Sequence, residues 1–185
     1  MKLVILDRDG TLNPLGEDYI TSADEWTAVP GALEAIARLN HAGWHVVVAT
    51  NQPGLGRGLF DVVALNAIHA KMHRQLAALG GRIDAVFYCP HAADEECTCR
   101  KPAPGLLEQI CERYGAERSE VQVVGSCAAH LQADLIVTPM NDSFVDFDML
   151  GTVDPVSMEL TKPSLYSLTV WEGRKQRALS GQRQA

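Results

Sequence analysis

The 185-residue sequence lacks several features that would each define a class of protein. No apolar run reaches the roughly 18 residues that suggest a membrane span, so we expect no membrane partner. The first residues, Met-Lys-Leu-Val-Ile-Leu-Asp, do not resemble a signal peptide. Basic residues are in deficit, 16 against 23 acidic ones, and the formal net charge of −7 argues against a nucleic-acid partner.

Cysteine is scarce and unevenly placed. The chain has five cysteines, and three of them fall within residues 89–99, which is not the pattern of a secreted disulfide framework. We therefore expect a cytoplasmic protein and a monomer. A hydrophobic content of 46% in a chain of this length is enough for one domain with its own core.

Short apolar runs alternate with helical patterns along the chain. Strands are predicted at 4–6, 44–50, 83–87, 121–124 and 135–138. A helix is predicted after each of the first three strands, and the second helix is capped by Asp61. This alternation predicts an α/β fold, a parallel sheet flanked by helices. Ligands of such sheets bind at the carboxyl ends of the strands, where the motifs below fall.

The stretch "LDRDGTLN" places two carboxylates directly after the first strand. Asp7 and Asp9 are two residues apart, so on an extended chain they share a face, and Gly10 permits a sharp turn. A hard cation such as Mg²⁺ would relieve their repulsion. One carboxylate could then attack phosphorus while the other transfers a proton. The alternative is a solvated Asp-Gly turn.

Four stretches, taken together and in this order, resemble the haloacid-dehalogenase (HAD) superfamily of phosphatases, in its histidinol-phosphatase-like branch. They are "LDRDGTLN" (6–13), "ATNQPGLGRG" (49–58), "CPHAADEECTC" (89–99) and "CRKPAPG" (99–105). The resemblance implies a Rossmann-like HAD fold over residues 1–126. It also implies a Mg²⁺-dependent phosphomonoesterase that acts on a sugar bisphosphate, a heptose 1,7-bisphosphate, through an aspartyl-phosphate intermediate. Histidinol phosphate is the alternative substrate.

The resemblance also implies roles for individual residues. Asp7 would be the nucleophile and a Mg²⁺ ligand, and Asp9 the general acid/base, with its backbone carbonyl on the metal. Lys101 would neutralise charge on the nucleophile and the transferring group. The implied substrate-binding residues are Thr50 and Asn51, for the phosphoryl oxygens, and Arg57 and Arg100, outside the phosphoryl pocket. The alternatives are that Lys101 is a surface lysine and that Thr50 is an ordinary threonine at the end of a strand.

The loop at 89–99 carries a second set of possible metal ligands: Cys89, His91, Cys97 and Cys99. Three thiolates and one imidazole form a closed tetrahedral set, typical of structural Zn²⁺. The alternative is a cluster of reduced thiols. A second histidine pair, His69 and His73, is four apart on a predicted helix. With no carboxylate partner nearby, we expect it on a solvated face.

The fourth family motif departs from the pattern. In "VVGSCAAHLQAD" (123–134), Ser126 and His130 stand where the family has two metal-binding acids. Mg²⁺ is usually held by one or two carboxylates, so we expect weakened metal binding and impaired turnover. An inactive binding or interaction protein is the alternative.

Residues 127–185 resemble a different family, a fragment of a ParA/MinD-type ATPase close to the MipZ division-positioning proteins. The phosphate loop G-x-x-x-x-G-K-[ST] that such ATPases need is absent from the sequence. We therefore interpret the chain as a phosphatase core followed by a segment of another origin. That segment is expected to complete the sheet or to pack loosely.

Overall fold

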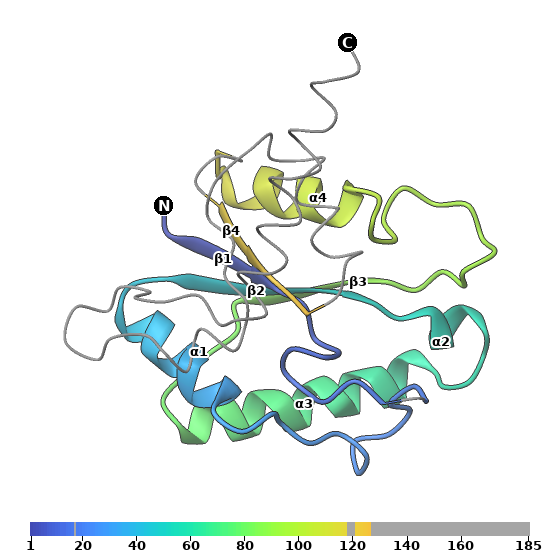
Figure 1. Ribbon diagram of the computed structural model, residues 1–185, viewed down its shortest axis with the longest axis horizontal. Coiled ribbons are helices and arrows are strands. Elements are labelled where there is room, and N and C mark those ends of the chain that lie inside the picture. Colours follow the sequence, from blue (N-terminus) through green and yellow to red (C-terminus); the bar gives the residue numbers. More distant parts are fainter. Residues whose placement is uncertain (17, 118–120, 127–185) are drawn as a thin grey trace, which may run out of the picture.

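A four-stranded parallel sheet forms the centre of the computed structural model, which describes residues 1–16, 18–117 and 121–126 (Figure 1). The order is β3-β2-β1-β4, so the first strand of the chain lies in the interior of the described sheet. Leu6, the last residue of β1, pairs with Val48 of β2 and Val124 of β4. The strands are β1 Leu3–Leu6, β2 His45–Asn51, β3 Ala85–Cys89 and β4 Val121–Val124.

Helices cover both faces of this sheet, which confirms the predicted α/β fold. Figure 1 shows α4 on one face and α1 with α3 on the other. A short helix, α2, follows β2 at the carboxyl edge of the sheet. The helices are α1 Ala32–His41, α2 Pro53–Gly56, α3 Val62–Ala78 and α4 Gly105–Tyr114.

Two apolar cores result from the alternation of side chains along the strands. Leu3 and Ile5 of β1 belong to the core on the α4 face, whereas Val4 and Leu6 belong to the core that includes residues of α1 and α3. Because both faces are covered, β1 is apolar at every position and fully buried. The first polar residue after it, Asp7, therefore marks the point where the chain leaves the core.

The predicted boundaries differ from the structure mainly at β3. The strand begins at Ala85, two residues later than predicted. Ile83 is buried in the core, and its apolar character reflects that packing. Asp84 accepts a hydrogen bond from the Val46 backbone N–H (2.9 Å). The predicted cap is confirmed, since the Asp61 side chain accepts from the Ala64 N–H at 2.8 Å.

Two further predictions concern membrane-spanning segments and the fifth strand. None of the helices in the described part of the chain has the length and apolar character that a bilayer crossing requires. The strand predicted at 135–138 lies outside the described residues, as does the rest of 127–185.

Candidate active site

Asp7 lies at the carboxyl tip of β1, and its backbone extends the pairing with β4. Its N–H donates to the Val124 carbonyl at 2.9 Å. Its side chain is 6% exposed and forms an ion pair with Lys101, with 2.9 Å between Oδ1 and Nζ. The same oxygen accepts from the Arg8 backbone N–H at 2.9 Å. The interactions fix one carboxylate oxygen at the strand tip beside a buried ammonium group.

Lys101 comes from the segment between β3 and α4, and its backbone is fixed at β2. Asn51, the last residue of β2, donates through Nδ2 to the Lys101 carbonyl (2.9 Å) and accepts the Lys101 N–H through Oδ1 (3.0 Å). The Lys101 ammonium also donates to the Ala49 carbonyl at 2.7 Å. The structure thus brings together Asp7, Asn51 and Lys101, which the sequence had placed in three separate motifs.

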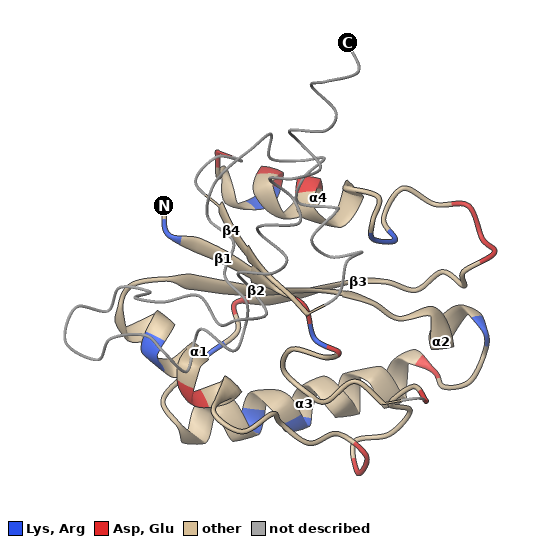
Figure 2. Cartoon of the chain, viewed as in Figure 1, with Lys and Arg blue, Asp and Glu red and all other residues tan. Residues whose placement is uncertain are grey.

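Asp9 is held by a different set of groups. The Arg8 guanidinium donates to it from Nε (3.1 Å) and from Nη2 to both oxygens (2.8 and 3.0 Å). Asn13 Nδ2 donates to Oδ1 at 3.1 Å and Gln52 Nε2 to Oδ2 at 2.9 Å. Figure 2 shows the resulting order of acid, base and acid at the tip of β1. The Asp9 side chain remains 28% exposed, so solvent reaches it.

Thr50 is fully buried next to this group, where its hydroxyl accepts from Gln52 Nε2 at 2.8 Å. The turn after Asp9 depends on Gly10, whose φ of 79° lies in the left-handed region. The N–H of Gly10 donates to the Asn13 carbonyl at 2.8 Å. The chain therefore turns sharply directly after the two acids.

Ser126 follows β4 and faces the same turn. Its backbone N–H donates to the Thr11 hydroxyl at 3.2 Å. Its own hydroxyl is buried and has no hydrogen-bond partner among the described residues. A Cβ added at Gly10 would lie 2.4 Å from Ser126 Oγ, which shows how closely the serine approaches the turn. A buried hydroxyl without a partner is costly, and it marks a position suited to an oxygen ligand of a hard cation.

The loop between β3 and α4 brings four possible metal ligands together. The ligand atoms of Cys89, His91, Cys97 and Cys99 all lie within 4.8 Å of one another. Cys89 and Cys97 sulfurs are 3.7 Å apart, and His91 Nδ1 lies 3.4 Å from Cys89 and 3.3 Å from Cys99. Tetrahedral Zn²⁺ with Zn–S bonds of about 2.3 Å places sulfurs about 3.8 Å apart. The predicted ligands therefore fit such an ion.

The thiols of this loop differ in their acidity. Burial, and then a hydrogen bond with Cys99, raise the pKa of the Cys89 thiol to about 12. Burial also raises the pKa of Cys97, but hydrogen bonds, first from the Arg100 backbone and then with Cys89, outweigh it and lower the value to about 7. A metal that bound here would have to displace the proton of Cys89.

This cysteine loop is joined to the segment after β2 by backbone hydrogen bonds. Gln52 N–H donates to the Cys89 carbonyl and Gly56 N–H to the Pro90 carbonyl, both at 2.8 Å. A Cβ at Gly56 would lie 2.5 Å from the Ala92 nitrogen, so only glycine permits this approach. These hydrogen bonds therefore fix the loop relative to the polar residues at the end of β2.

The two arginines expected to bind substrate point to other protein groups. The Arg100 guanidinium donates to the carbonyls of Ala92 and Ala93 in the cysteine loop. Arg57 is exposed, and its guanidinium lies 5.9 Å from the centre of the Tyr19 ring. Arg57 is the more exposed of the two arginines. A substrate-binding role for Arg57 and Arg100 stays a prediction.

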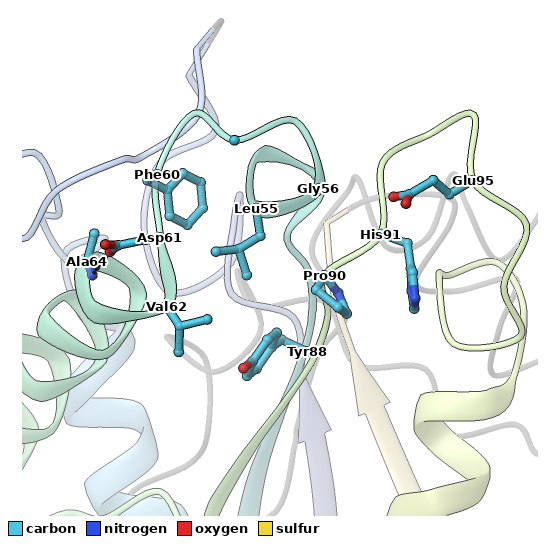
Figure 3. A pocket seen from close by; sticks show the side chains of 11 residues that line it. Leu55, Gly56, Phe60, Asp61, Val62, Ala64, Tyr88, Pro90, His91 and Glu95 are labelled. Carbon is cyan, nitrogen blue, oxygen red and sulfur yellow. Dashed lines mark hydrogen bonds between the residues drawn. The ribbon is translucent and has the colours of Figure 1, made fainter.

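A pocket of about 880 Å³ lies beside this edge of the sheet (Figure 3). Leu55, Val62 and Tyr88 gather around it, and the lining is largely apolar. Its residues come from α2, the start of α3, β3 and the cysteine loop, and they include neither Asp7 nor Asp9. The carboxylates are thus separate from this cavity. The lining residues are Leu55, Gly56, Gly58, Phe60, Asp61, Val62, Ala64, Tyr88, Pro90, His91 and Glu95.

One prediction about the histidine pair was wrong. His69 is buried, with 8% of its surface exposed, and its Nε2 lies 3.4 Å from Arg8 Nη1. Burial and the charge of Arg8 lower the pKa of His69 to about 4. Arg8, Gln52 and His69 were not predicted from the sequence as the group that surrounds Asp9. Arg8 and Gln52 lie inside the motifs at 6–13 and 49–58, and this place in the sequence was the signal that could have linked them to Asp9.

The fold and the acidic strand tip define a hydrolase of the Rossmann-like α/β class. A family model described as haloacid dehalogenase-like hydrolase matches residues 15–133. The chain therefore belongs to the haloacid dehalogenase-like hydrolases, as the four motifs predicted. A second family model, described as ATPase MipZ, matches residues 119–185. The two matches agree with the change of resemblance near residue 127.

The individual relatives carry narrower descriptions than the family models. A D-glycero-beta-D-manno-heptose-1,7-bisphosphate 7-phosphatase of Bordetella bronchiseptica is 56% identical over 133 residues, which are 72% of this chain and 74% of the relative. The Pseudomonas aeruginosa protein of the same name is 49% identical over 71% of this chain and 74% of its own length. A crystal structure of the D,D-heptose 1,7-bisphosphate phosphatase from B. bronchiseptica, complexed with magnesium and phosphate, has a TM-score of 0.75 and 43% identity, covering 96% of this chain and 99% of that one.

Proposed function

We propose that this protein is a phosphatase that removes a phosphate from a sugar bisphosphate, D-glycero-D-manno-heptose 1,7-bisphosphate. The observation that carries the proposal is the buried ion pair of Asp7 and Lys101 beside the partly exposed carboxylate of Asp9. The names of the relatives support the substrate. Histidinol phosphate is the alternative substrate. A monomer in the cytoplasm stays our prediction.

The chemistry assigned to the two carboxylates is a double displacement. An oxygen of Asp7 attacks phosphorus, so that an O–P bond forms and the bond from phosphorus to the sugar oxygen breaks. Asp9 gives its proton to the departing sugar oxygen. Asp9 then takes a proton from water, which attacks phosphorus, breaks the bond to Asp7 and releases inorganic phosphate.

Other side chains position the transferring group and balance its charge. The Lys101 ammonium, 2.9 Å from Asp7, lowers the repulsion between a carboxylate nucleophile and an anionic phosphate. Thr50 and Asn51 are assigned to the phosphoryl oxygens. Asn51 also fixes the Lys101 backbone through its two hydrogen bonds. Arg57 and Arg100 are assigned to the substrate beyond the reacting phosphate.

Mg²⁺ would be held by Asp7, the Asp9 backbone carbonyl and the Ser126 hydroxyl. When bound, it would neutralise charge on the transferring phosphoryl group. All three ligand atoms are oxygens. The Ser126 hydroxyl, for which the described part of the chain offers no hydrogen-bond partner, supports the assignment. A serine supplies no negative charge, so Asp7 is the one side-chain carboxylate among these three proposed ligands. We propose weakened metal binding and impaired turnover for this reason. His130 lies outside the described residues.

The cysteine loop is assigned a structural Zn²⁺ held by Cys89, His91, Cys97 and Cys99. The fit of the four ligand atoms supports this assignment. The chain is further proposed to consist of a phosphatase core, residues 1–126 with the zinc loop at 89–99, and a segment of different resemblance, 127–185. The family match of MipZ to residues 119–185 supports the division.

The direct test is phosphate release from heptose 1,7-bisphosphate, histidinol phosphate and ATP, each with and without Mg²⁺. We expect slow, Mg²⁺-dependent release that is fastest with the heptose. The Ser126→Asp, His130→Asp double variant should bind Mg²⁺ more tightly and turn over faster, whereas Ser126→Ala should not. A double variant without gain would contradict the impairment. No release by either protein would leave an inactive phosphate-binding protein, the alternative that the missing acids favour.

A further inference from the structure

Arg8 lies between Asp7 and Asp9 in the sequence, and the double displacement gives it no role. We propose that Arg8 is a positioning residue: its buried guanidinium, braced by Gln52 and His69, holds the Asp9 carboxylate in the orientation for proton transfer to the leaving group. The proposal rests on the proposed function, because it concerns the proton-transfer step of that reaction.

The contacts of Arg8 are unusual for an arginine. Its side chain is 1% exposed, although arginine is rarely buried without a partner. Three of its contacts, at 2.8 to 3.1 Å, go to the Asp9 carboxylate. The planar fork of a guanidinium fixes the plane of a carboxylate as well as its distance. A fully buried charge is costly, and the Asp9 carboxylate is what compensates it.

Two further side chains keep the guanidinium in place. Arg8 Nη2 donates to Gln52 Oε1 at 3.2 Å, and Gln52 Nε2 donates to Asp9 at 2.9 Å, which closes a ring of hydrogen bonds. On the far side, His69 Nε2 lies 3.4 Å from Arg8 Nη1. Arginine has no acceptor, so the imidazole must present a lone pair there. The lowered pKa of His69 agrees with a neutral ring.

The arrangement suits positioning better than substrate binding. The nitrogens of Arg8 are directed at protein groups in the interior, whereas Asp9 is 28% exposed. The carboxylate is thus held by buried donors and is still partly exposed to solvent, from which a substrate would approach. A general acid has to lie within hydrogen-bond reach of that oxygen. A small rotation of Asp9 would therefore slow proton transfer without changing the Asp7–Lys101 pair.

The choice of leaving group provides the test. A sugar oxygen must be protonated as it departs, whereas p-nitrophenolate is stable enough to leave without a proton. We compare kcat/KM for a sugar phosphate and for p-nitrophenyl phosphate in Arg8→Lys, which keeps the charge and loses the fork. Asp9→Asn gives the reference pattern for loss of the acid. Met72→Ala, a buried change on α3, is the control for simple destabilisation.

We expect Arg8→Lys to lose about 10- to 100-fold in kcat/KM on the sugar phosphate, within the range of general acid catalysis, and less than about 3-fold on p-nitrophenyl phosphate. Because a substitution of buried Arg8 could prevent folding, His69→Leu is the second variant. It should also lose more kcat/KM on the sugar phosphate than on p-nitrophenyl phosphate, by a smaller factor than Arg8→Lys. Met72→Ala should lower both rates equally.

Equal losses on the two substrates in folded Arg8→Lys and His69→Leu would overturn the positioning role and leave Arg8 as a structural ion pair. Failure of the proposed function looks different, because wild type would then hydrolyse neither substrate. In that case the series is repeated in the Ser126→Asp, His130→Asp background. No turnover there would overturn the proposed function and the role of Arg8 together.

Discussion

Two regions at the same edge of the sheet could bind metal ions, and they are held in opposite ways. The carboxylate cluster, Asp7 and Asp9, is surrounded by protein donors, and each acid has its own cation. The cysteine loop, residues 89–99, brings three thiols and an imidazole to within 4.8 Å of one another. The first region follows directly on β1, whereas the second, apart from Cys89 at the end of β3, lies in a loop without regular structure.

The difference explains what each region needs from a metal. Lys101 and Arg8 already compensate the charges of Asp7 and Asp9, so the acidic pair is stable as part of the core. A cation there would serve the reaction, and folding would depend on it little. The thiols have no such compensation, and metal binding to such a loop is also folding free energy. Removing the two metals should therefore have different consequences.

The largest expected effect is loss of the nucleophile. Asp7→Asn should lower phosphate release by about three orders of magnitude or more, comparable to loss of a covalent catalyst in other enzymes. The fold should persist, because Asn can still accept from the Arg8 N–H, although Lys101 loses its counter-ion. Circular dichroism and kcat measured together separate the two effects. An Asp7→Asn protein with more than a tenth of the wild-type rate would contradict nucleophilic attack by this residue.

Loss of the zinc loop comes next in size. Cys97→Ser should abolish stoichiometric zinc binding, lower the melting temperature and reduce turnover by about 10- to 100-fold, as loss of a group that orients a site does elsewhere. The effect would pass through the backbone, because the loop is hydrogen-bonded to Gln52 and Gly56 and Lys101 lies two residues after Cys99. Metal analysis and thermal unfolding, with and without chelator, provide the measurement.

Cys111→Ala is the matched control for this change. Cys111 is a buried thiol on α4 outside the loop, so its removal should leave zinc content unchanged. If Cys97→Ser retained zinc and wild-type turnover, the loop would be a cluster of reduced thiols and the contrast between the two regions would disappear.

A smaller effect should appear where the regions meet. Asn51 joins β2 to Lys101 with hydrogen bonds of 2.9 and 3.0 Å. Asn51→Ala should cost about 1–3 kcal/mol of stability for the two bonds and lower kcat by roughly 10-fold through a misplaced Lys101. Asn51→Asp is the informative partner, since it keeps the acceptor and loses the donor. Wild-type kinetics in both variants would show that the contacts of the Lys101 ammonium with Asp7 and the Ala49 carbonyl are enough to position it.

The sequence predicted the scaffold because the scaffold is governed by local rules. Apolar runs, the Asp61 cap and glycine at turns are short-range signals. That Asp7 and Thr50 lie at the same edge could be predicted because parallel strands end at one edge. A strand boundary was missed where Ile83 is apolar for packing and does not belong to β3.

The support around Asp9 could not be predicted in the same way. His69 lies 61 residues from Arg8, and nothing in the periodicity of α3 shows that this position faces an arginine. We expected His69 on a solvated face, whereas α3 turns it toward the interior. The burial of a histidine against an arginine far away in the sequence depends on how the helix packs against the sheet. A single sequence does not reveal that packing.

The smallest effect concerns His69 and acid stability. Burial and the charge of Arg8 lower its pKa to about 4 in the folded protein, while in the unfolded chain it is about 6.5. Between these values the unfolded state binds a proton that the folded state does not. The contribution of the neutral ring is thus fully present above pH 6.5 and is lost as the pH falls toward 4.

Urea unfolding of the wild type between pH 7.5 and 4.5 should therefore show an extra fall in the free energy of unfolding, with a slope of up to about 1.4 kcal/mol per pH unit from this one group. His69→Gln should flatten the profile, because glutamine does not titrate and can still accept from Arg8. His41→Gln, which removes an exposed histidine of α1, is the control. If His69→Gln and His41→Gln retained the same slope, the neutral histidine would not be part of what holds Arg8 and, through it, Asp9.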